Sequence, residues 1–374
     1  MALTIAFDGG PTTQGAGVGR YASGLLGALL AQDTADQHTV VLPRGARLPA
    51  ATSAATADWR PVHLPVGERV AEIVWHRLRL PIPVDRLCGM PDVYHSPNFL
   101  LPPLARARGV VTVHDLSYLR LPQYAFPALA EYLRKTVPRS LERAELVLAD
   151  SRNTAADVVE LLHVPPDRVR TVYPGVGPAF GPAEMDGELT ALAGSYGLRR
   201  PYVLCVGTIE PRKNLVAAIQ AFMAVAPRLG SGLQLVLAGA IGWLAEETMG
   251  AAQEAGDRVR LVGRVAEEDL PALYRQAEAL LYPSHYEGFG LPPLEAMACG
   301  TPVIVARNSS LPEVTGDVAV YCGTDAESIA AALDGLFTDP SAQERLRRDG
   351  PARARLFTWE KAAETVRSLY HELA

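Results

Sequence analysis

The chain has 374 residues, 48% of them apolar, and a formal net charge of −6 at pH 7. This length is enough for two α/β domains of ordinary size, and we expect no nucleic-acid partner for a chain of this charge. No run of 18 apolar residues and no basic leader with an apolar core occurs, so we expect neither a membrane-spanning helix nor a signal peptide. The four cysteines are far apart and lack C-x-x-C pairing, which favours buried free thiols in a reducing cytoplasm over disulfides or metal ligands.

Short apolar runs, separated by helical or polar segments, recur along the chain, which is typical of parallel sheets covered by helices on both faces. A first series of strands is predicted at Leu3–Phe7, Thr39–Leu42, Val93–His95, Val110–Val113 and Leu146–Ala149. A second series is predicted at Tyr202–Val206, Gln234–Ala238, Val259–Leu261, Ala279–Tyr282, Pro302–Val305 and Ala319–Tyr321. Proline and glycine interrupt the pattern at Val172–Phe180, so we predict two doubly wound domains that meet there. A final helix is predicted over Phe357–Leu373, with Thr358 as its N-cap.

The first glycine-rich segment, Gly9–Arg20, follows the first strand and precedes a helical pattern. A dinucleotide-binding fingerprint would need G-x-G-x-x-G and an acidic residue closing the second strand, and neither is present. Glycines such as Gly17 and Gly19 allow a backbone to approach a bound group closely. The alternative is a flexible turn after the first strand.

Two strand ends in the first half of the chain carry polar side chains. His114 follows the strand Val110–Val113, and Asp115 comes next. A single histidine in such a place is usually structural, but its position at the carboxyl end of a parallel strand favours a functional role. Asp115 is expected to support the loop or to orient its neighbours. His95 and Asn98 occupy a similar strand end and are candidate contacts for an acceptor.

A basic segment at 131–143 combines positive charge with apolar residues; its cations are Arg134, Lys135, Arg139 and Arg143. Such a face can attract an anionic membrane surface. A solvated basic face is the alternative, and Pro138 is expected to interrupt the helix.

Two adjacent cations, Arg212 and Lys213, follow the predicted strand Tyr202–Val206 and precede a helical pattern. At such a junction they can neutralise a departing diphosphate, and a nearby helix N-terminus would favour anions as well. Two solvated loop charges are the alternative.

The stretch 282–305 places two carboxylates, Glu287 and Glu295, eight residues apart around a junction of loop and helix. Prolines at 292 and 293 fit only the first turn of a helix, so the helix is predicted to begin near residue 291. Helix N-termini attract phosphate, and carboxylates suit the vicinal hydroxyls of sugars. The junction is expected to be lined by Gly288, Phe289, Gly290 and Leu291. This pattern indicates a site for a sugar nucleotide; the alternative is an ordinary helix turn with an accidental loop glutamate.

The sequence EGFGLPPLE at 287–295 resembles the E-x7-E motif of retaining GT-B glycosyltransferases of family 4, and the resemblance extends over most of the chain. It implies an α/β architecture of two Rossmann-like domains that face each other across a cleft. The acceptor-side domain would span 1–176 and the nucleotide-sugar domain 177–356. The last helix, in 357–374, would cross back onto the first domain.

The resemblance also implies roles for the candidate residues. Glu287 and the following loop amides would contact the transferred sugar, Glu295 would hold the ribose, and His114 would contact the sugar or its acceptor side. The glycine-rich segment would face the donor diphosphate. Backbone groups around Arg264 and Val265 would bracket the nucleobase. Many members carry an arginine where this chain has Thr208, which leaves one diphosphate contact in doubt.

The expected mechanism follows from these groups and from the lack of a D-x-D motif. Because Arg212 and Lys213 can supply positive charge, no essential metal is expected. The resemblance implies transfer with retention, in which the leaving phosphate takes the acceptor proton and Glu287 positions and stabilises the sugar. The catalytic set would be these three residues and His114. If Glu287 attacked instead, a covalent glycosyl-enzyme would form.

The donor and the acceptor are the least determined expectations. The segments IAFDGG, GVGRY, VHDLSY and VGTIEPRKN resemble bacterial mannosyltransferases of surface polysaccharide assembly. This implies GDP-mannose as donor, with UDP-glucose as its competitor, and a glycan or lipid-linked glycan as acceptor. A lipid-linked acceptor would place the protein at the inner face of the membrane. A sugar-nucleotide epimerase of the same architecture and a non-catalytic sugar-nucleotide sensor are the other classes, and the oligomeric state is left open.

Overall fold

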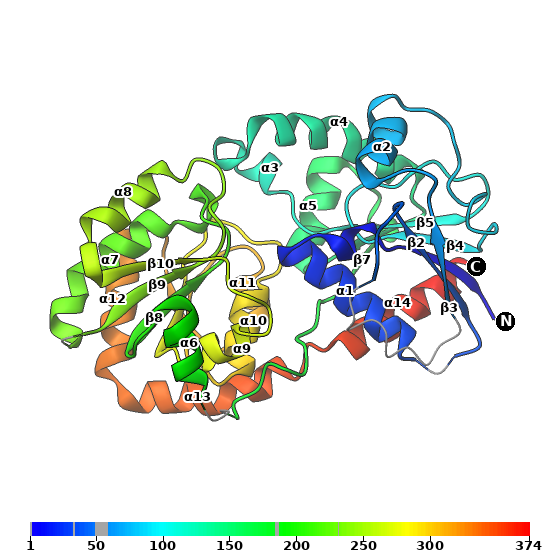
Figure 1. The fold of residues 1–374 in the computed structure, drawn as a ribbon. Coiled ribbons are helices and arrows are strands. Elements are labelled where there is room, and N and C mark those ends of the chain that lie inside the picture. The colour runs from blue at the N-terminus through cyan, green and yellow to red at the C-terminus, as the bar shows by residue number, and fades with distance from the viewer. Residues whose placement is uncertain (1, 33, 49–58, 184–186, 231) are drawn as a thin grey trace. The chain divides into compact units, whose positions relative to one another are not determined.

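The computed structural model describes residues 2–32, 34–48, 59–183, 187–230 and 232–374. The chain forms two compact units, whose course can be followed by colour in Figure 1. The first unit comprises Met1–Arg120, Pro127–Gly175 and Phe357–Ala374, and the second comprises Leu121–Phe126 and Val176–Leu356. The second unit is therefore an insertion between parts of the first.

The first unit contains a seven-stranded parallel sheet with the order β3-β2-β1-β4-β5-β6-β7. Its strands are β1 (Thr4–Asp8), β2 (Gln37–Leu42), β3 (Trp59–His63), β4 (Val93–Ser96), β5 (Arg108–Val113), β6 (Leu146–Ala149) and β7 (Val169–Thr171). Five of them were predicted to within two residues. The two edge strands, β3 and β7, were missed, because β3 contains Arg60 and Pro61 and β7 has only three residues.

Helices cover both faces of this sheet. They are α1 (Ala16–Leu30), α2 (Glu68–Glu72), α3 (Ser117–Arg120), α4 (Pro127–Arg143), α5 (Arg152–Leu162) and α14 (Trp359–Leu373), with short turns η1 (Gly10–Thr13), η3 (Ile73–Arg77, a π-helix) and η5 (Pro166–Arg168). Helices α1 and α14 lie side by side (Figure 1). Leu25 and Leu29 of α1 and Val366 of α14 share one core with β1. The N-cap prediction is confirmed, because Thr358 accepts a hydrogen bond from the Lys361 amide.

The glycine-rich segment Gly9–Arg20 forms the short turn η1 and the first turns of α1. Gly17 and Gly19 both lie in the first turns of α1. A β-carbon on Gly19 would lie 1.8 Å from the Gln14 carbonyl oxygen, whereas a β-carbon on Gly17 would meet no atom within 4 Å. Gly19 is thus required by packing within the turn, and Gly17 is not.

Helix α4 runs without a break through Pro138, so the predicted interruption is wrong. The proline removes one backbone donor, but the flanking turns are anchored in the core by Val137 and Leu141, and Ser140 Oγ accepts from the Leu101 amide at 3.0 Å. The predicted basic face is also divided. Lys135 pairs with Glu131 and Arg134 Nη2 donates to the Tyr118 carbonyl, whereas Arg139 and Arg143 line a cavity.

The second unit contains a six-stranded parallel sheet with the order β10-β9-β8-β11-β12-β13. Its strands are β8 (Tyr202–Val206), β9 (Gln234–Ala238), β10 (Val259–Gly263), β11 (Ala279–Tyr282), β12 (Val303–Ala306) and β13 (Val320–Cys322). All six were predicted to within two residues. The four central strands β9, β8, β11 and β12 are almost entirely buried aliphatic runs, which is typical of strands covered on both faces.

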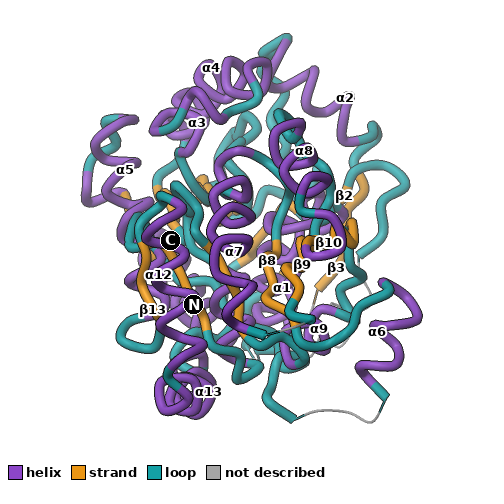
Figure 2. The backbone as a smooth tube through the Cα atoms, turned by 90° about the vertical axis from the view of Figure 1, so that its left-hand side faces the viewer, coloured by secondary structure: helices purple, strands orange, loops and turns teal. Residues whose placement is uncertain are grey.

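The helices of the second unit are α6 (Glu188–Tyr196), α7 (Leu215–Leu229), α8 (Glu246–Glu254), α9 (Leu270–Arg275), α10 (Leu291–Ala298), α11 (Leu311–Thr315), α12 (Ala326–Thr338) and α13 (Pro340–Ala354), with turns η4 (Pro122–Tyr124), η6 (Pro211–Lys213) and η7 (Gly256–Arg258). Helices α7 and α12 lie side by side (Figure 2). Their apolar faces share one core with β8 and β9, in which Phe222 and Leu333 are fully buried.

The strand order reverses once in each sheet, between β1 and β4 in the first and between β8 and β11 in the second. In open α/β sheets, ligands bind beyond the carboxyl ends of the strands at this switch point. All four cysteines are buried free thiols, as predicted. Among the described residues, no helix combines the length and apolar character needed to cross a membrane.

Candidate active site

An ion pair joins the two strands at the switch point of the second sheet. Lys213 closes the turn η6 after β8, and Glu287 lies in the loop after β11. Lys213 Nζ donates to Glu287 Oε1 at 2.7 Å and to Tyr282 Oη at 2.6 Å. The structure thus brings together two of the predicted site residues.

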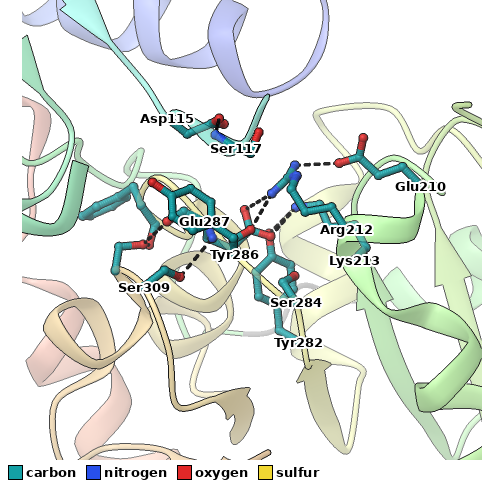
Figure 3. A network of polar contacts seen from close by, with 12 residues as sticks. Asp115, Ser117, Glu210, Arg212, Lys213, Tyr282, Ser284, Tyr286, Glu287 and Ser309 are labelled. Carbon is teal, nitrogen blue, oxygen red and sulfur yellow. Dashed lines mark hydrogen bonds and ion pairs between the residues drawn. The ribbon is translucent and has the colours of Figure 1, made fainter. Parts of the chain in front are cut away.

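Arg212 completes the environment of the Glu287 carboxylate. Its Nη1 lies 3.0 Å from Glu287 Oε2 and 2.7 Å from the Tyr286 carbonyl oxygen, and its Nη2 donates to Glu210 Oε1 at 2.6 Å. Figure 3 shows Arg212 and Lys213 converging on the carboxylate, with Glu210 on the far side of Arg212. Two cations and two anions therefore alternate in this cluster.

The charges of this cluster determine the ionisation of Glu287, which is only 6% exposed. Burial alone would favour the neutral acid, but the charges of Arg212 and Lys213 outweigh it and lower the pKa of Glu287 to about 2. Burial also lowers the pKa of Lys213, and Glu287 opposes that shift. Glu287 is consequently an ionised and weakly basic carboxylate at neutral pH.

The loop that carries Glu287 is held by the loop after β12. Ser309 Oγ accepts from the Glu287 amide at 3.0 Å, and Ser310 Oγ donates to the carbonyl oxygens of Glu287 and Phe289 at 2.9 and 2.7 Å. Asn308 Nδ2 donates to the Ser284 carbonyl at 3.0 Å. Three consecutive polar residues therefore fix the backbone on which the carboxylate stands.

Helix α10 begins at Leu291, as predicted, with both prolines in its first turn. Gly290 precedes it at φ 112°, a conformation that side chains rarely adopt, and a β-carbon there would lie 3.0 Å from Leu311 Cδ2. Glu295 is 3% exposed and accepts from Tyr274 Oη at 2.8 Å through Oε2. The buried tyrosine fixes the orientation of this carboxylate.

The remaining donor-side candidates lie around these anchors. Gly288 and Phe289 are buried between Glu287 and α10. Arg264 and Val265 follow β10, two strands from β8, and the arginine is exposed whereas the valine is buried. Their expected contacts to a nucleotide remain predictions.

In the first unit, His114 lies at the carboxyl end of β5 and is hydrogen bonded through both ring nitrogens. Nδ1 lies 2.8 Å from Asp150 Oδ2, and Nε2 lies 2.9 Å from the Pro97 carbonyl oxygen. A carbonyl only accepts, so Nε2 carries a proton, and a second proton occupies the bond between Nδ1 and Oδ2. Burial raises the pKa of Asp150, and the pKa of His114 is raised because Asp150 outweighs the effect of burial. The pair therefore keeps its proton, and neither ring nitrogen is available as a base.

The candidate acceptor contacts have different surroundings. His95 is fully buried; its Nδ1 lies 2.6 Å from Tyr370 Oη and its Nε2 lies 2.9 Å from Thr112 Oγ1. Nδ1 thus joins β4 to α14, and Nε2 joins β4 to the neighbouring strand β5. Both ring nitrogens are engaged inside the first unit, and the expected contact with an acceptor remains a prediction. Asn98 is half-buried in the loop after β4. Asp115 Oδ1 accepts from the Ser117 amide at 2.8 Å, which fits the supporting role expected for it.

Comparisons with known proteins agree with this arrangement. Residues 15–180 match the model of Glycosyltransferase Family 4, and residues 196–353 match that of glycosyl transferases group 1. Over 283 residues, which are 74% of each chain, the protein is 35% identical to an O-antigen chain mannosyltransferase B from Escherichia coli. The chain belongs to glycosyltransferase family 4.

Two further similarities extend this assignment of the glycosyltransferase. A serotype-specific mannosyltransferase WbdA from Escherichia coli is 32% identical over 228 residues, which make up 59% of this chain and only 28% of that longer protein. Sucrose-phosphate synthase from Thermosynechococcus elongatus superimposes with a TM-score of 0.78 at 22% identity, over 99% of both chains. The predicted GT-B fold is thereby confirmed.

Sequence reasoning missed several residues that shape the sites of the glycosyltransferase. Glu210, which pairs with Arg212, is visible in the same EPRKN segment, but nothing in the sequence shows that it is buried. Tyr282 was recognised only as the end of a strand. Asp8 closes β1 at the switch point of the first sheet, and burial raises the pKa of its carboxyl to about 6. An acidic residue at the end of a first strand was the available signal for Asp8.

Proposed function

We propose that this glycosyltransferase transfers mannose from GDP-mannose to a hydroxyl group of a growing or lipid-linked glycan, with retention of configuration. The observation that carries the proposal is the ionised Glu287 carboxylate, held between two cations at the switch point of the second sheet. The printed name of the Escherichia coli relative, an O-antigen chain mannosyltransferase, supports mannose as the sugar.

The charges of the cluster suit a transition state in which the sugar becomes positive and the diphosphate becomes negative. Glu287, positioned against the sugar, stabilises the positive charge, and Arg212 and Lys213 stabilise the departing diphosphate. The glycosidic bond to the donor phosphate breaks, the acceptor oxygen bonds to the same carbon, and a phosphate oxygen takes the acceptor proton. Because the two cations supply the positive charge, the reaction needs no divalent metal.

A role for Glu287 as a nucleophile is less well supported. A carboxylate with a pKa of about 2 is a weak base, and both of its oxygens are already engaged by cations. Attack on the sugar would require it to leave these contacts. We therefore assign Glu287 to positioning and electrostatic stabilisation, so no covalent glycosyl-enzyme forms.

The remaining roles are distributed over the two units. In the second unit, the loop and helix start at 288–291 bind the sugar and the diphosphate, Glu295 binds the ribose, and Arg264 and Val265 lie beside the base. The first unit supplies the acceptor side, where His114 contacts the sugar through its ring and not as a base, because Asp150 and Pro97 engage both of its nitrogens. A lipid-linked acceptor would bring the protein to the cytoplasmic face of the membrane.

Two measurements test the proposal. The first is a thermal-shift panel of GDP, UDP, ADP and dTDP with their sugar conjugates. We expect GDP-mannose to raise the melting temperature of the protein selectively, both with and without EDTA. Transfer of labelled mannose to a mannose-containing oligosaccharide, followed by NMR of the new anomeric proton, then reports retention or inversion. A melting temperature raised selectively by UDP-glucose would identify UDP-glucose as the donor instead. Consumption of a sugar nucleotide without any acceptor would favour the epimerase, and binding without turnover would favour a sensor.

A further inference from the structure

A cavity of about 280 Å³ opens in the first unit between the segment 75–81 and helix α4. Its volume is close to the lower end, about 300 Å³, of the range found for ligand pockets. The side chains that line it include Trp75, His76, Arg79, Arg139 and Arg143. Three of the five are guanidinium groups, which bind phosphate through a planar fork of donors.

The positive charge of this arginine cavity is poorly compensated. Arg143 Nη2 donates to the Leu101 carbonyl at 2.8 Å, which fixes its position without neutralising it. Within the described ranges, neither Arg79 nor Arg139 has an ion-pair partner. The acidic neighbours are Glu142, next to Arg143, and Glu72, which pairs with Arg77.

His76 adds no charge to the cavity at neutral pH. Burial and then the charge of Arg143 lower the pKa of its imidazole to about 4. The cavity is therefore an arginine site, and an anion placed in it would offset the mutual repulsion of three guanidinium groups.

An apolar edge lies directly beside the cavity. Leu78, Leu80 and Ile82 are exposed by 63%, 41% and 47%, whereas Arg79 and Pro81 between them line the cavity. The segment thus alternates, with every second side chain apolar and in solvent. An exposed apolar group of this kind, next to cations, is typical of proteins that bind a membrane surface.

Hydrogen bonds hold this segment in place. The amides of Leu78 and Leu80 donate to the carbonyl oxygens of Ile73 and Val74 at 2.7 and 2.9 Å, and Trp75 Nε1 donates to the Ile82 carbonyl at 2.9 Å. The first of these bonds spans five residues and closes the π-helical turn η3, and such turns are frequent at functional sites. The backbone therefore fixes the alternation in which Arg79 and Pro81 line the cavity and the neighbouring apolar side chains face solvent.

We propose that the arginine cavity binds the phosphate group of a membrane lipid while Leu78, Leu80 and Ile82 insert between the lipid head groups. Charge complementarity selects an anion, and the apolar edge selects one that is carried by a lipid and not dissolved in water. A second copy of the chain is disfavoured as occupant, because a two-fold contact would bring arginine against arginine. This inference goes beyond the proposed transfer reaction and does not depend on the identity of the donor.

The test is co-sedimentation of the full chain with phosphatidylcholine vesicles that contain or lack phosphatidylglycerol. The wild-type protein is expected to sediment only with the anionic vesicles. Arg79→Ala with Arg139→Ala should weaken this binding by roughly thirtyfold, at about 1 kcal/mol for each lost cation. Leu78→Ser with Ile82→Ser should weaken it with all arginines intact, and Arg79→Lys with Arg139→Lys should restore most of it.

The matched control removes two exposed arginines of the second unit, Arg345→Ala with Arg348→Ala, and should leave the binding unchanged. An equal loss of vesicle binding in this control would show that the binding depends on the net charge of the protein and not on the arginine cavity, and it would overturn the proposal. Failure of the wild-type protein to sediment, or stabilisation by inorganic pyrophosphate without vesicle binding, would also overturn it. Circular dichroism melting of each variant reports folding, and the GDP-mannose thermal shift tests the transfer function separately.

Discussion

Lys213 Nζ lies 2.7 Å from Glu287 Oε1, so an ion pair joins the turn η6 after β8 to the loop after β11, between residues 74 positions apart. Both side chains are largely buried. Removal of one partner from a buried pair costs about 3–5 kcal/mol, because the other charge remains without its counterion.

We therefore expect Lys213→Met and Glu287→Gln each to destabilise the protein, and the double variant to cost clearly less than their sum. A double-mutant cycle by urea unfolding measures this coupling. The exposed pair Arg228 and Asp334 is the control, with an expected coupling of about 0–1 kcal/mol. Additive costs at Lys213 and Glu287 would contradict the pairing.

The same carboxylate is expected to act in turnover more than in nucleotide binding. Glu287→Ala should lower kcat by at least about 10²–10³, the usual effect of removing one electrostatic group at a transition state. Affinity for GDP should change little if Glu287 contacts the sugar as proposed. Glu268→Ala, an exposed glutamate of the same unit, is the control. Equal losses in turnover and GDP affinity would contradict the assignment of Glu287 to the sugar.

Acid should destabilise the second unit through Glu287. Its pKa is about 2 in the folded protein and about 4.5 when unperturbed, so its contribution to stability is present above the unfolded value and is lost as the pH falls towards 2. The shift corresponds to about 3 kcal/mol. Urea unfolding over this pH window should show a smaller loss in Glu287→Gln than in the wild type. Parallel curves would mean that Glu287 is not paired in solution.

The titration midpoint of His114 should lie above the ordinary value for a histidine, because Asp150 raises the pKa of the imidazole despite its burial. Its raised pKa means that the stabilising proton is present below the unfolded value and is lost only as the pH rises through the folded one. NMR of the imidazole Cε1–H against pH measures this directly. In Asp150→Asn the ring should titrate at lower pH; a wild-type midpoint at the ordinary value would refute the shared proton.

The two glycines of the first helical turns make a matched pair. Gly19→Ala places a β-carbon against the Gln14 carbonyl oxygen and should destabilise the first unit by about 1–3 kcal/mol, whereas Gly17→Ala meets no atom within 4 Å. Gly17→Ala should leave stability unchanged or raise it by up to about 1 kcal/mol. If the backbone at Gly17 approaches the donor diphosphate, this well-folded variant should still show a raised KM for the donor.

The parts of the fold that could be predicted are those where one physical signal dominates. The central strands are aliphatic runs, and Thr358 and the two prolines before Leu294 mark helix starts by their own chemistry. The edge strand β3 was not predicted, because its half-exposed positions tolerate Arg60 and Pro61 and it therefore lacks an apolar pattern. Helix α4 continued through Pro138, because tertiary packing outweighs one lost hydrogen bond.

The candidate site could be predicted as a set of residues but not as a set of contacts. Arg212, Lys213 and Glu287 follow neighbouring strands, so their proximity was foreseeable from the strand order of such folds. The burial of Glu210 and the use of both His95 nitrogens inside the first unit depend on packing between segments far apart in sequence. Contacts of this kind produce no recognisable pattern in the local sequence.

The return of Phe357–Ala374 to the first unit determines the order in which the protein can be completed during synthesis. Val366 and Tyr370 belong to the core around β1, so that core lacks part of its lining until residues 357–374 have been synthesised. The second unit is translated whole before this happens, and domains generally fold as units as they emerge. The first unit therefore cannot complete its core before the second unit has been synthesised, and until then the face of its sheet that α14 covers stays without that helix.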